Sequence, residues 1–171
     1  MHDALPKALK KLRRSGLAPS LDVRLQEAAG HGLNHAEFLE LILQDELAVR
    51  GDRLLARRVR AADFREPKTL EDFDWSFHTS IQRKQVYELA TCKFIRERRD
   101  LLLLGPPGTG KSHLVQAIGY QALKAGHTVL YRSIFDVVRD FLHDEAIGGE
   151  EKVLAKYLSP SRVAVATSRT C

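Results

Sequence analysis

The sequence of 171 residues has little cysteine, few aromatic side chains and no long apolar run. Its two cysteines, Cys92 and Cys171, are too few and too far apart for a disulfide framework or a zinc site. No apolar stretch approaches the roughly 20 residues that a helix needs to cross a bilayer, and the first residues lack the apolar core of a signal peptide. We therefore expect a cytoplasmic protein without a membrane partner.

The charge of the chain is moderately basic. Lysine and arginine total 27 against 22 aspartate and glutamate residues, which gives a net charge of +5. With 44% hydrophobic and 29% charged residues, the composition is typical of a globular protein. A basic excess of this size is compatible with nucleic-acid binding, but a solvated positive surface explains it equally well.

Residues 1–65 predict a basic helical domain. Apolar residues recur at helical spacing over 5–12, and lysines and arginines occupy the other side of this helix. A second helix is expected over 21–29, and Asn34 with Glu37 three residues later predicts the capped start of a longer one. The arginines late in that helix fit a solvated face with ion pairs, or a surface for nucleic acid or a partner protein.

Residues 66–79 contain a proline and no periodicity, so we assign them to a linker between domains. A helix is then expected from residue 80 to about residue 94, because apolar side chains return at helical spacing. Trp75 precedes this helix, and we interpret it as a packing residue.

Strands and helices alternate from residue 101 onward. Leu101 to Leu104 form a short apolar run that ends at glycine, which predicts a strand buried on both faces. Helices are expected over 111–124 and after Ser133, and further strands over 128–132 and 162–166. This alternation predicts an α/β fold built on a parallel sheet.

The loop between the first of these strands and its helix matches the phosphate-binding pattern G-x-x-x-x-G-K-[ST] in full. Its glycines let backbone N–H groups turn toward an anion, and the following helix points the positive end of its dipole at the same place. Lys111 is expected to reach the β- and γ-phosphates of ATP, and Ser112 to bind Mg²⁺. The candidate nucleotide-binding residues are Gly105, Pro106, Pro107, Gly108, Thr109, Gly110, Lys111 and Ser112.

Hydrolysis of a nucleotide in such a site needs an acidic residue at the end of a second strand. Asp144 and Glu145 follow apolar residues, but those residues share the helical register that begins after Ser133. The predicted strand over 162–166 runs to the C-terminus without a carboxylate, and no acidic residue occurs after Glu151. We assign no catalytic residue.

Several stretches together resemble the IstB-like helper ATPases of insertion-sequence transposition, which are related to the DnaC helicase loaders of the AAA+ group. They are Thr-Leu-Glu-Asp-Phe-Asp-Trp at 69–75, the leucines and loop at 102–114, and matching positions up to about residue 158. The resemblance implies a P-loop NTPase core of the AAA+ type, preceded by a small helical domain. It also implies ATP and Mg²⁺ as cofactors, a transposase and double-stranded DNA as partners, and a homo-oligomer in the complete family.

The resemblance ends at Ser159. The family pattern continues there with an acidic strand, sensor residues and an arginine finger, none of which residues 159–171 contain. We interpret this stretch as an aberrant tail of a frameshifted or truncated gene, and we assign residues 80–158 to the N-terminal part of the ATPase core. Because the family's sheet has strand order 5-1-4-3-2, the strand at 101–104 would lack both neighbours, and we expect an incomplete core of marginal stability.

Three functions remain open at this point. The first is an ATP-binding transposition helper whose hydrolysis is unsettled. The second is a non-catalytic fragment that binds DNA or a partner, including a fragment of a DnaC-like helicase loader. The third is a small-molecule kinase, which the basic helical region and the lack of an acceptor site disfavour.

Overall fold

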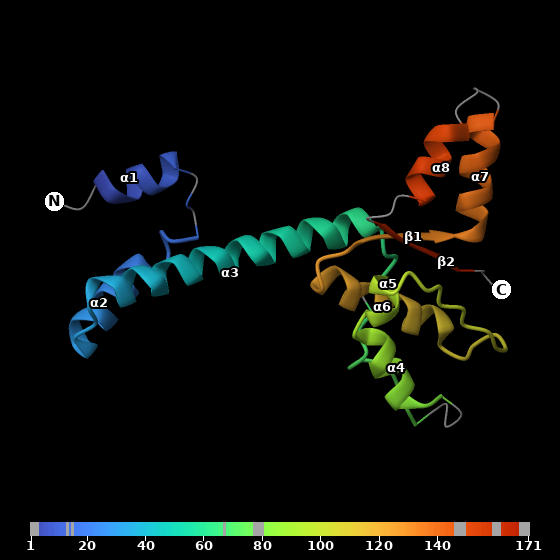
Figure 1. The fold of residues 1–171 in the computed structure, drawn as a ribbon, viewed down its shortest axis with the longest axis horizontal. Helices are drawn as coiled ribbons and strands as arrows, with labels where there is room; N and C mark the ends of the chain where they lie inside the picture. The colour runs from blue at the N-terminus through green and yellow to red at the C-terminus, as the bar shows by residue number, and fades with distance from the viewer. Residues whose placement is uncertain are drawn as a thin grey trace. The chain divides into compact units, whose positions relative to one another are not determined.

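The computed structural model describes residues 4–12, 14, 16–66, 68–76, 81–145, 150–158 and 162–167. The chain divides into two compact units, Met1–Ala56 and Arg57–Cys171 (Figure 1). No helix among the described residues is long and apolar enough to span a membrane.

The N-terminal unit contains α1 (Ala4–Lys11), α2 (Leu21–His31) and the first part of α3 (His35–Ala62). All three predicted helices are confirmed. Its small core consists of Leu17, Leu21 and Ile42, against which Leu9 and Phe38 pack.

Asn34 caps the start of α3 as the sequence predicts. Its Oδ1 atom accepts the backbone N–H groups of Ala36 at 2.9 Å and Glu37 at 3.0 Å. The Glu37 carboxylate in turn accepts the Asn34 backbone N–H at 2.8 Å. These reciprocal bonds satisfy donors that a helix start otherwise leaves unpaired, so this capping box sets where α3 begins.

A two-bond ion pair joins α2 to α3 within this unit. The Arg24 guanidinium donates to both carboxylate oxygens of Asp45, from Nε at 2.9 Å and from Nη2 at 2.8 Å. Hydrogen bonding from Arg24 lowers the pKa of Asp45 from 3.8 to about 2. The ionised carboxylate therefore stabilises the fold above its ordinary pKa, and this contribution is lost as the pH falls from about 4 toward about 2.

We expect the Arg24→Ala variant to return the titration midpoint of the Asp45 carboxyl toward 3.8. A carbon-detected NMR titration of the aspartate carboxyls measures this midpoint directly. The matched control is Glu27→Gln, which removes the other partner of Arg24 and leaves both bonds to Asp45 in place. A midpoint near 3.8 in the unsubstituted chain would contradict the ion pair.

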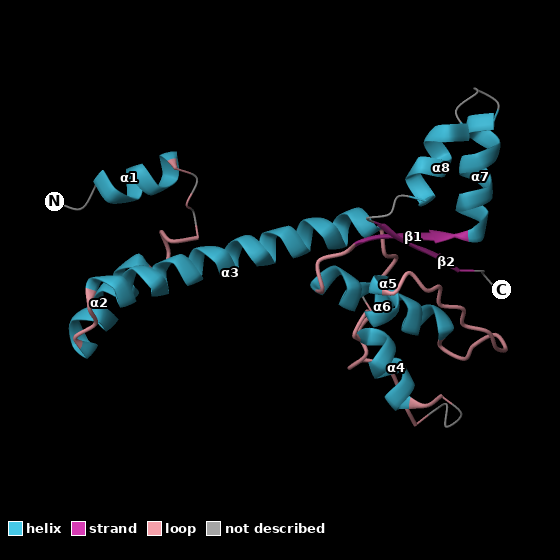
Figure 2. Ribbon diagram, in the orientation of Figure 1, coloured by secondary structure: helices cyan, strands magenta, loops and turns pink. Residues whose placement is uncertain are grey.

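The C-terminal unit combines helices with a two-stranded sheet (Figure 2). β1 and β2 pair in parallel, with Thr128 opposite Arg162 and Ser133 opposite Thr167. The chain passes from β1 to β2 through two helices, as parallel pairing requires a long connection. Besides the end of α3, the elements are α4 (Arg83–Ala90), α5 (Lys93–Arg96), α6 (Lys111–Lys124), β1 (Thr128–Ser133), α7 (Ile134–Glu145), α8 (Glu150–Leu158) and β2 (Arg162–Thr167).

The core of this unit lies around α6. On one side of the helix, Leu114, Ala117 and Ile118 pack against Val86 of α4 and against the segment that precedes α4. On another side, a Cβ built on Gly119 would lie 3.2 Å from the ring of Phe64, so glycine lets this ring approach the helix closely. The helix that follows the predicted phosphate loop is therefore held on more than one side.

The segment predicted as a linker, 66–79, contributes to this core. Leu70 and Phe73 are buried in it, and Trp75 packs against it. The packing role predicted for Trp75 agrees with this, and the segment buries single side chains although it lacks helical periodicity. Residues 67 and 77–80 of this stretch lie outside the described part of the chain.

The predicted strand over 101–104 is wrong. These residues have no regular secondary structure and pair with no strand among the described residues, where the sheet consists of β1 and β2. Leu101 and Leu103 pack against the core, whereas Leu102 is 78% and Leu104 83% exposed. Exposure alternates along these leucines as it does along a strand, but the backbone hydrogen bonds to a neighbouring strand are missing. The described residues do not form the wider parallel sheet that the sequence predicts.

The single helix predicted over 80–94 is also wrong, because it is divided into α4 and α5. Cys92 lies between them with a left-handed backbone, φ 58°. Its side chain is buried, and burial raises the pKa of its thiol. The predicted strand over 162–166 is confirmed as β2, while Cys171 lies outside the described residues.

Candidate nucleotide-binding site

The phosphate loop, residues 105–112, passes directly into the first turn of α6. Gly108 and Gly110 have φ angles of 78° and 74°, in the left-handed region that side chains with a Cβ avoid. A Cβ on Gly110 would also lie 2.6 Å from Cε2 of Phe73, closer than two carbon atoms can approach. Two glycines of the motif are thus required by the backbone conformation, and one of them also by packing.

The side chain of Lys111 curls back over the loop. Its Nζ atom donates to the carbonyl oxygens of Gly105, at 2.9 Å, and of Pro106. It also lies 3.3 Å from the hydroxyl of Thr109, which donates to the Pro106 carbonyl at 3.0 Å. The ammonium group is therefore held by two carbonyl oxygens and lies near one hydroxyl oxygen of the loop.

The start of α6 supplies further hydrogen-bond donors. Gly110 occupies its N-cap without a capping side chain, and the first N–H bonded back to the Gly110 carbonyl is that of Leu114, at 3.0 Å. The N–H groups of residues 111–113 thus have no acceptor within the helix. Together with the helix dipole and the Lys111 charge, they form a donor set suited to a phosphate anion.

The eight predicted residues are consecutive and form one continuous loop and helix start. Residues 105–108 and Ser112 are exposed, and Thr109, Gly110 and Lys111 are half-buried. Ser112 is the second residue of α6 and belongs to its first turn. An anion can reach this donor set from solvent.

His113 is a neighbour that the sequence analysis did not single out. Its Nε2 atom lies 2.8 Å from the backbone carbonyl oxygen of Thr69, and its ring packs edge-on against Phe73 with centroids 5.2 Å apart. The sequence gives only an indirect signal for this contact: the segment 69–75 and the loop region are both among the stretches that resemble the family.

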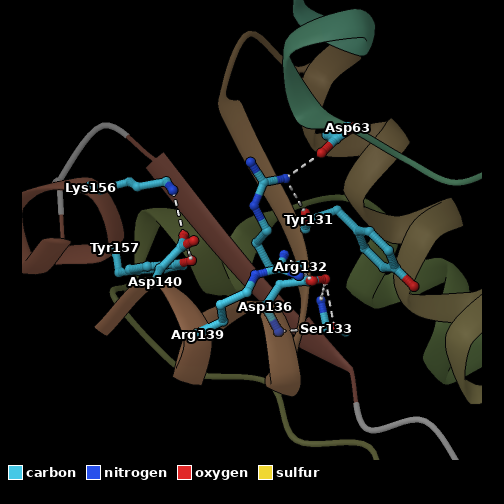
Figure 3. Close-up of polar contacts among 9 residues, drawn as sticks. All are labelled: Asp63, Tyr131, Arg132, Ser133, Asp136, Arg139, Asp140, Lys156 and Tyr157. Atoms are coloured by element: carbon cyan, nitrogen blue, oxygen red, sulfur yellow. Dashed lines mark hydrogen bonds and ion pairs between the residues drawn. The ribbon is translucent and has the colours of Figure 1, made fainter. Parts of the chain in front are cut away.

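A second group of charged residues lies beside β1 (Figure 3). Arg132 donates to the carboxylate of Asp63 at 2.6 Å and to the carbonyl of Tyr131 at 2.9 Å. Ser133 and Asp136 exchange hydrogen bonds at the start of α7, where the sequence predicts a helix after Ser133, so Ser133 caps this helix. These contacts attach the end of α3 and the start of α7 to the strand.

The same close-up shows how α7 and α8 are joined (Figure 3). Asp140 accepts hydrogen bonds from Lys156 and from the hydroxyl of Tyr157, at 2.7 Å for the latter. Bonding to Lys156 lowers the pKa of Asp140, while burial and the bond to Asp140 raise that of Tyr157 to about 12. Since these charges neutralise one another, we interpret this group as structural.

The acidic residues near the end of α7 have the position that their helical register predicts. α7 ends at Glu145, so Asp144 and Glu145 close a helix and do not follow a strand. The prediction that the chain lacks a catalytic carboxylate stays a prediction.

Comparison with known proteins agrees with the motif. The family model described as "IstB-like ATP binding protein" matches residues 7–167. An ATP-binding protein named for insertion sequence IS21 of Pseudomonas aeruginosa is 36% identical over 165 residues, which cover 96% of this chain and 62% of that protein.

Two further relatives are also named as ATP-binding proteins of insertion sequences. One, from Mycobacterium tuberculosis, is 31% identical over 92% of this chain and 62% of its own length. The other, from IS5376 of Geobacillus stearothermophilus, is 26% identical over 94% of this chain and 64% of its own length. The chain thus spans less than two thirds of the length of these three relatives.

Proposed function

Because the chain belongs to the family of IstB-like ATP binding proteins, we propose that its phosphate loop binds ATP together with Mg²⁺. The observation that carries this proposal is that one exposed loop and helix start contain both the Lys111 ammonium and the first N–H groups of α6, which have no acceptor within the helix. Such a donor set recognises a phosphate chain irrespective of the base, and the family description favours ATP.

Each part of the loop has a distinct role in this proposal. The backbone N–H groups enclose the phosphates, and Gly108 and Gly110 allow the conformation that directs them inward. Lys111 exchanges its loop carbonyls for phosphate oxygens, and Ser112 offers its hydroxyl to the metal. When bound, Mg²⁺ neutralises phosphate charge.

We place this activity in insertion-sequence transposition, with a transposase and double-stranded DNA as partners. The names of the relatives support the setting. The exposed lysines of α1, including Lys10 and Lys11 in its last turn, and the exposed Arg57 and Arg60 of α3 support contact with DNA phosphates. The proposal includes a homo-oligomer of the complete protein.

A second candidate is nucleotide binding without turnover, by a fragment that contacts DNA or a protein such as a helicase. The observation that favours it is the sequence of β2, Arg162–Thr167, which contains no carboxylate, whereas a hydrolase needs an acidic residue at the end of a second strand. Phosphate release from Mg·ATP separates the two candidates, since turnover that disappears in Lys111→Ala supports the first and its absence supports the second.

Replacing Lys111 by alanine tests binding itself. Since a hydrogen bond to a charged group contributes about 1.5–3 kcal/mol, we expect the affinity for Mg·ATP to fall by about ten- to one-hundredfold. Isothermal titration calorimetry measures this affinity. The control is Lys124→Ala at the other end of α6, where the ammonium lies over the Tyr120 ring. Equal affinities of the unsubstituted chain and Lys111→Ala would disprove the proposal.

A further inference from the structure

The segment at 69–75 braces the junction between the phosphate loop and α6. His113 Nε2 is 2.8 Å from the Thr69 carbonyl oxygen, so the ring must carry its proton on Nε2 to donate this bond. Phe73 lies between this ring and the loop, in edge contact with His113 and directly against Gly110. The segment is thus fastened by a hydrogen bond at one end and by ring packing further along.

The segment at 69–75 is fixed in the core, so it cannot move freely together with the phosphate loop. Leu70 and Phe73 are 1% and 6% exposed, and both belong to the cluster that includes Leu114 of α6. Because there is no room for even one carbon atom between Gly110 and Phe73, the loop cannot move toward the ring at this residue unless the ring moves too. The position of the N–H groups that face an anion therefore depends on where the segment sits.

We propose that His113 is a positioning residue for nucleotide binding, which holds the segment at 69–75 against the start of α6 and so fixes the phosphate loop. This inference rests on the proposed function, because the quantity that His113 controls is the affinity of the loop for Mg·ATP. His113 itself makes no contact with the phosphates.

The fluorescence of Trp75 can report on the position of the segment at 69–75. It is the single tryptophan of the chain, and it contacts Phe73 with ring centroids 4.8 Å apart. It also stacks on Tyr87 of α4 at 5.8 Å. A change at Gly110 is therefore transmitted through one ring to the only indole, and tryptophan emission reports on the loop without a label.

The test compares the affinity for Mg·ATP and the emission of Trp75 in the full chain and three variants at His113. His113→Ala removes the bond and the ring, His113→Phe keeps a ring without a donor, and His113→Gln restores an N–H donor. Loss of one neutral hydrogen bond predicts about a fivefold weaker affinity for His113→Ala and His113→Phe, with recovery in His113→Gln. Acrylamide quenching of Trp75 without nucleotide is expected to increase in the first two variants only.

The matched control is His31→Ala. The His31 ring also lies against a backbone carbonyl, that of Glu27 at 2.9 Å, but it belongs to α2 in the N-terminal unit. This variant is expected to keep both the affinity and the quenching of the unsubstituted chain. A merely structural role of His113 would lower thermal stability without the rescue of affinity by glutamine.

The outcomes separate the inference from the function on which it rests. If the unsubstituted chain binds Mg·ATP and His113→Ala binds equally well with unchanged quenching, the positioning role is refuted while the proposed function stands. If the unsubstituted chain does not bind Mg·ATP, both are refuted. Should His113→Ala fail to fold, His113→Phe against His113→Gln gives the same comparison.

Discussion

Replacing Gly110 by alanine is expected to prevent tight binding of Mg·ATP and to lower the free energy of unfolding by about 2–5 kcal/mol. The backbone contributes about 1–2 kcal/mol, because φ at this position is 74° and a Cβ is disfavoured there. The Phe73 ring contributes about 1–3 kcal/mol more, because the new Cβ would lie 2.6 Å from its Cε2 atom. Relief of this overlap must move either the ring or the loop.

Chemical denaturation measures the stability of this variant, and calorimetry with Mg·ATP measures its affinity. The control is Gly30→Ala within α2, where a new Cβ would meet no atom within 4 Å. Alanine is the better helix former, so this control is expected to be neutral or slightly stabilising. A Gly110→Ala variant with unchanged stability and affinity would show that the loop does not have this conformation.

The Leu70→Ala variant is expected to lose about 2–5 kcal/mol of stability, the usual cost of emptying a leucine site in a core. The side chain is 1% exposed and packs with Phe73, Leu114 and other buried residues. The sequence pattern assigns this position to a linker. In an exposed linker, the same substitution would lower the stability only slightly. The experiment therefore decides between a linker and a core segment.

Leu102→Ala is the matched control, because the same side chain is 78% exposed there. We expect its stability to stay within about 0.5 kcal/mol of the unsubstituted chain. Thermal and urea denaturation of both variants give the comparison. Equal losses at the two positions, or a loss only at Leu102, would contradict the assignment of core and surface.

Features set by neighbouring residues could be predicted from the sequence. The capping box of Asn34 and Glu37 uses side chains three positions apart, and the cap at Ser133 works in the same way. The phosphate loop is local too, because a helix start follows its glycines directly. Helical periodicity likewise located α6 and α7, whose apolar faces are dictated by spacing alone.

Features that depend on distant partners could not be predicted in this way. Leu101 to Leu104 have the composition of a buried strand, but a strand exists only where another segment offers its backbone, and composition does not show this. The missing neighbours of this segment were indicated only by the strand order of the family that the chain resembles. His113 and Thr69 are 44 positions apart, and nothing in either residue type indicates that they meet. The left-handed backbone at Cys92 could not be predicted either, because the helical pattern of apolar residues continues on both sides of it. The domain limits drawn from the sequence remain a prediction.

The hydrogen bonds of Lys111 have a thermodynamic consequence for any anion that enters the loop. The ammonium already donates to the carbonyls of Gly105 and Pro106, so a phosphate must replace these bonds and cannot simply add to them. The heat released on binding then reflects the difference between the hydrogen bonds of Lys111 to phosphate and its earlier hydrogen bonds to the carbonyls. This difference is smaller than the strength of the new bonds alone. Tight binding in such a loop must draw on the first N–H groups of α6, which have no acceptor within the helix.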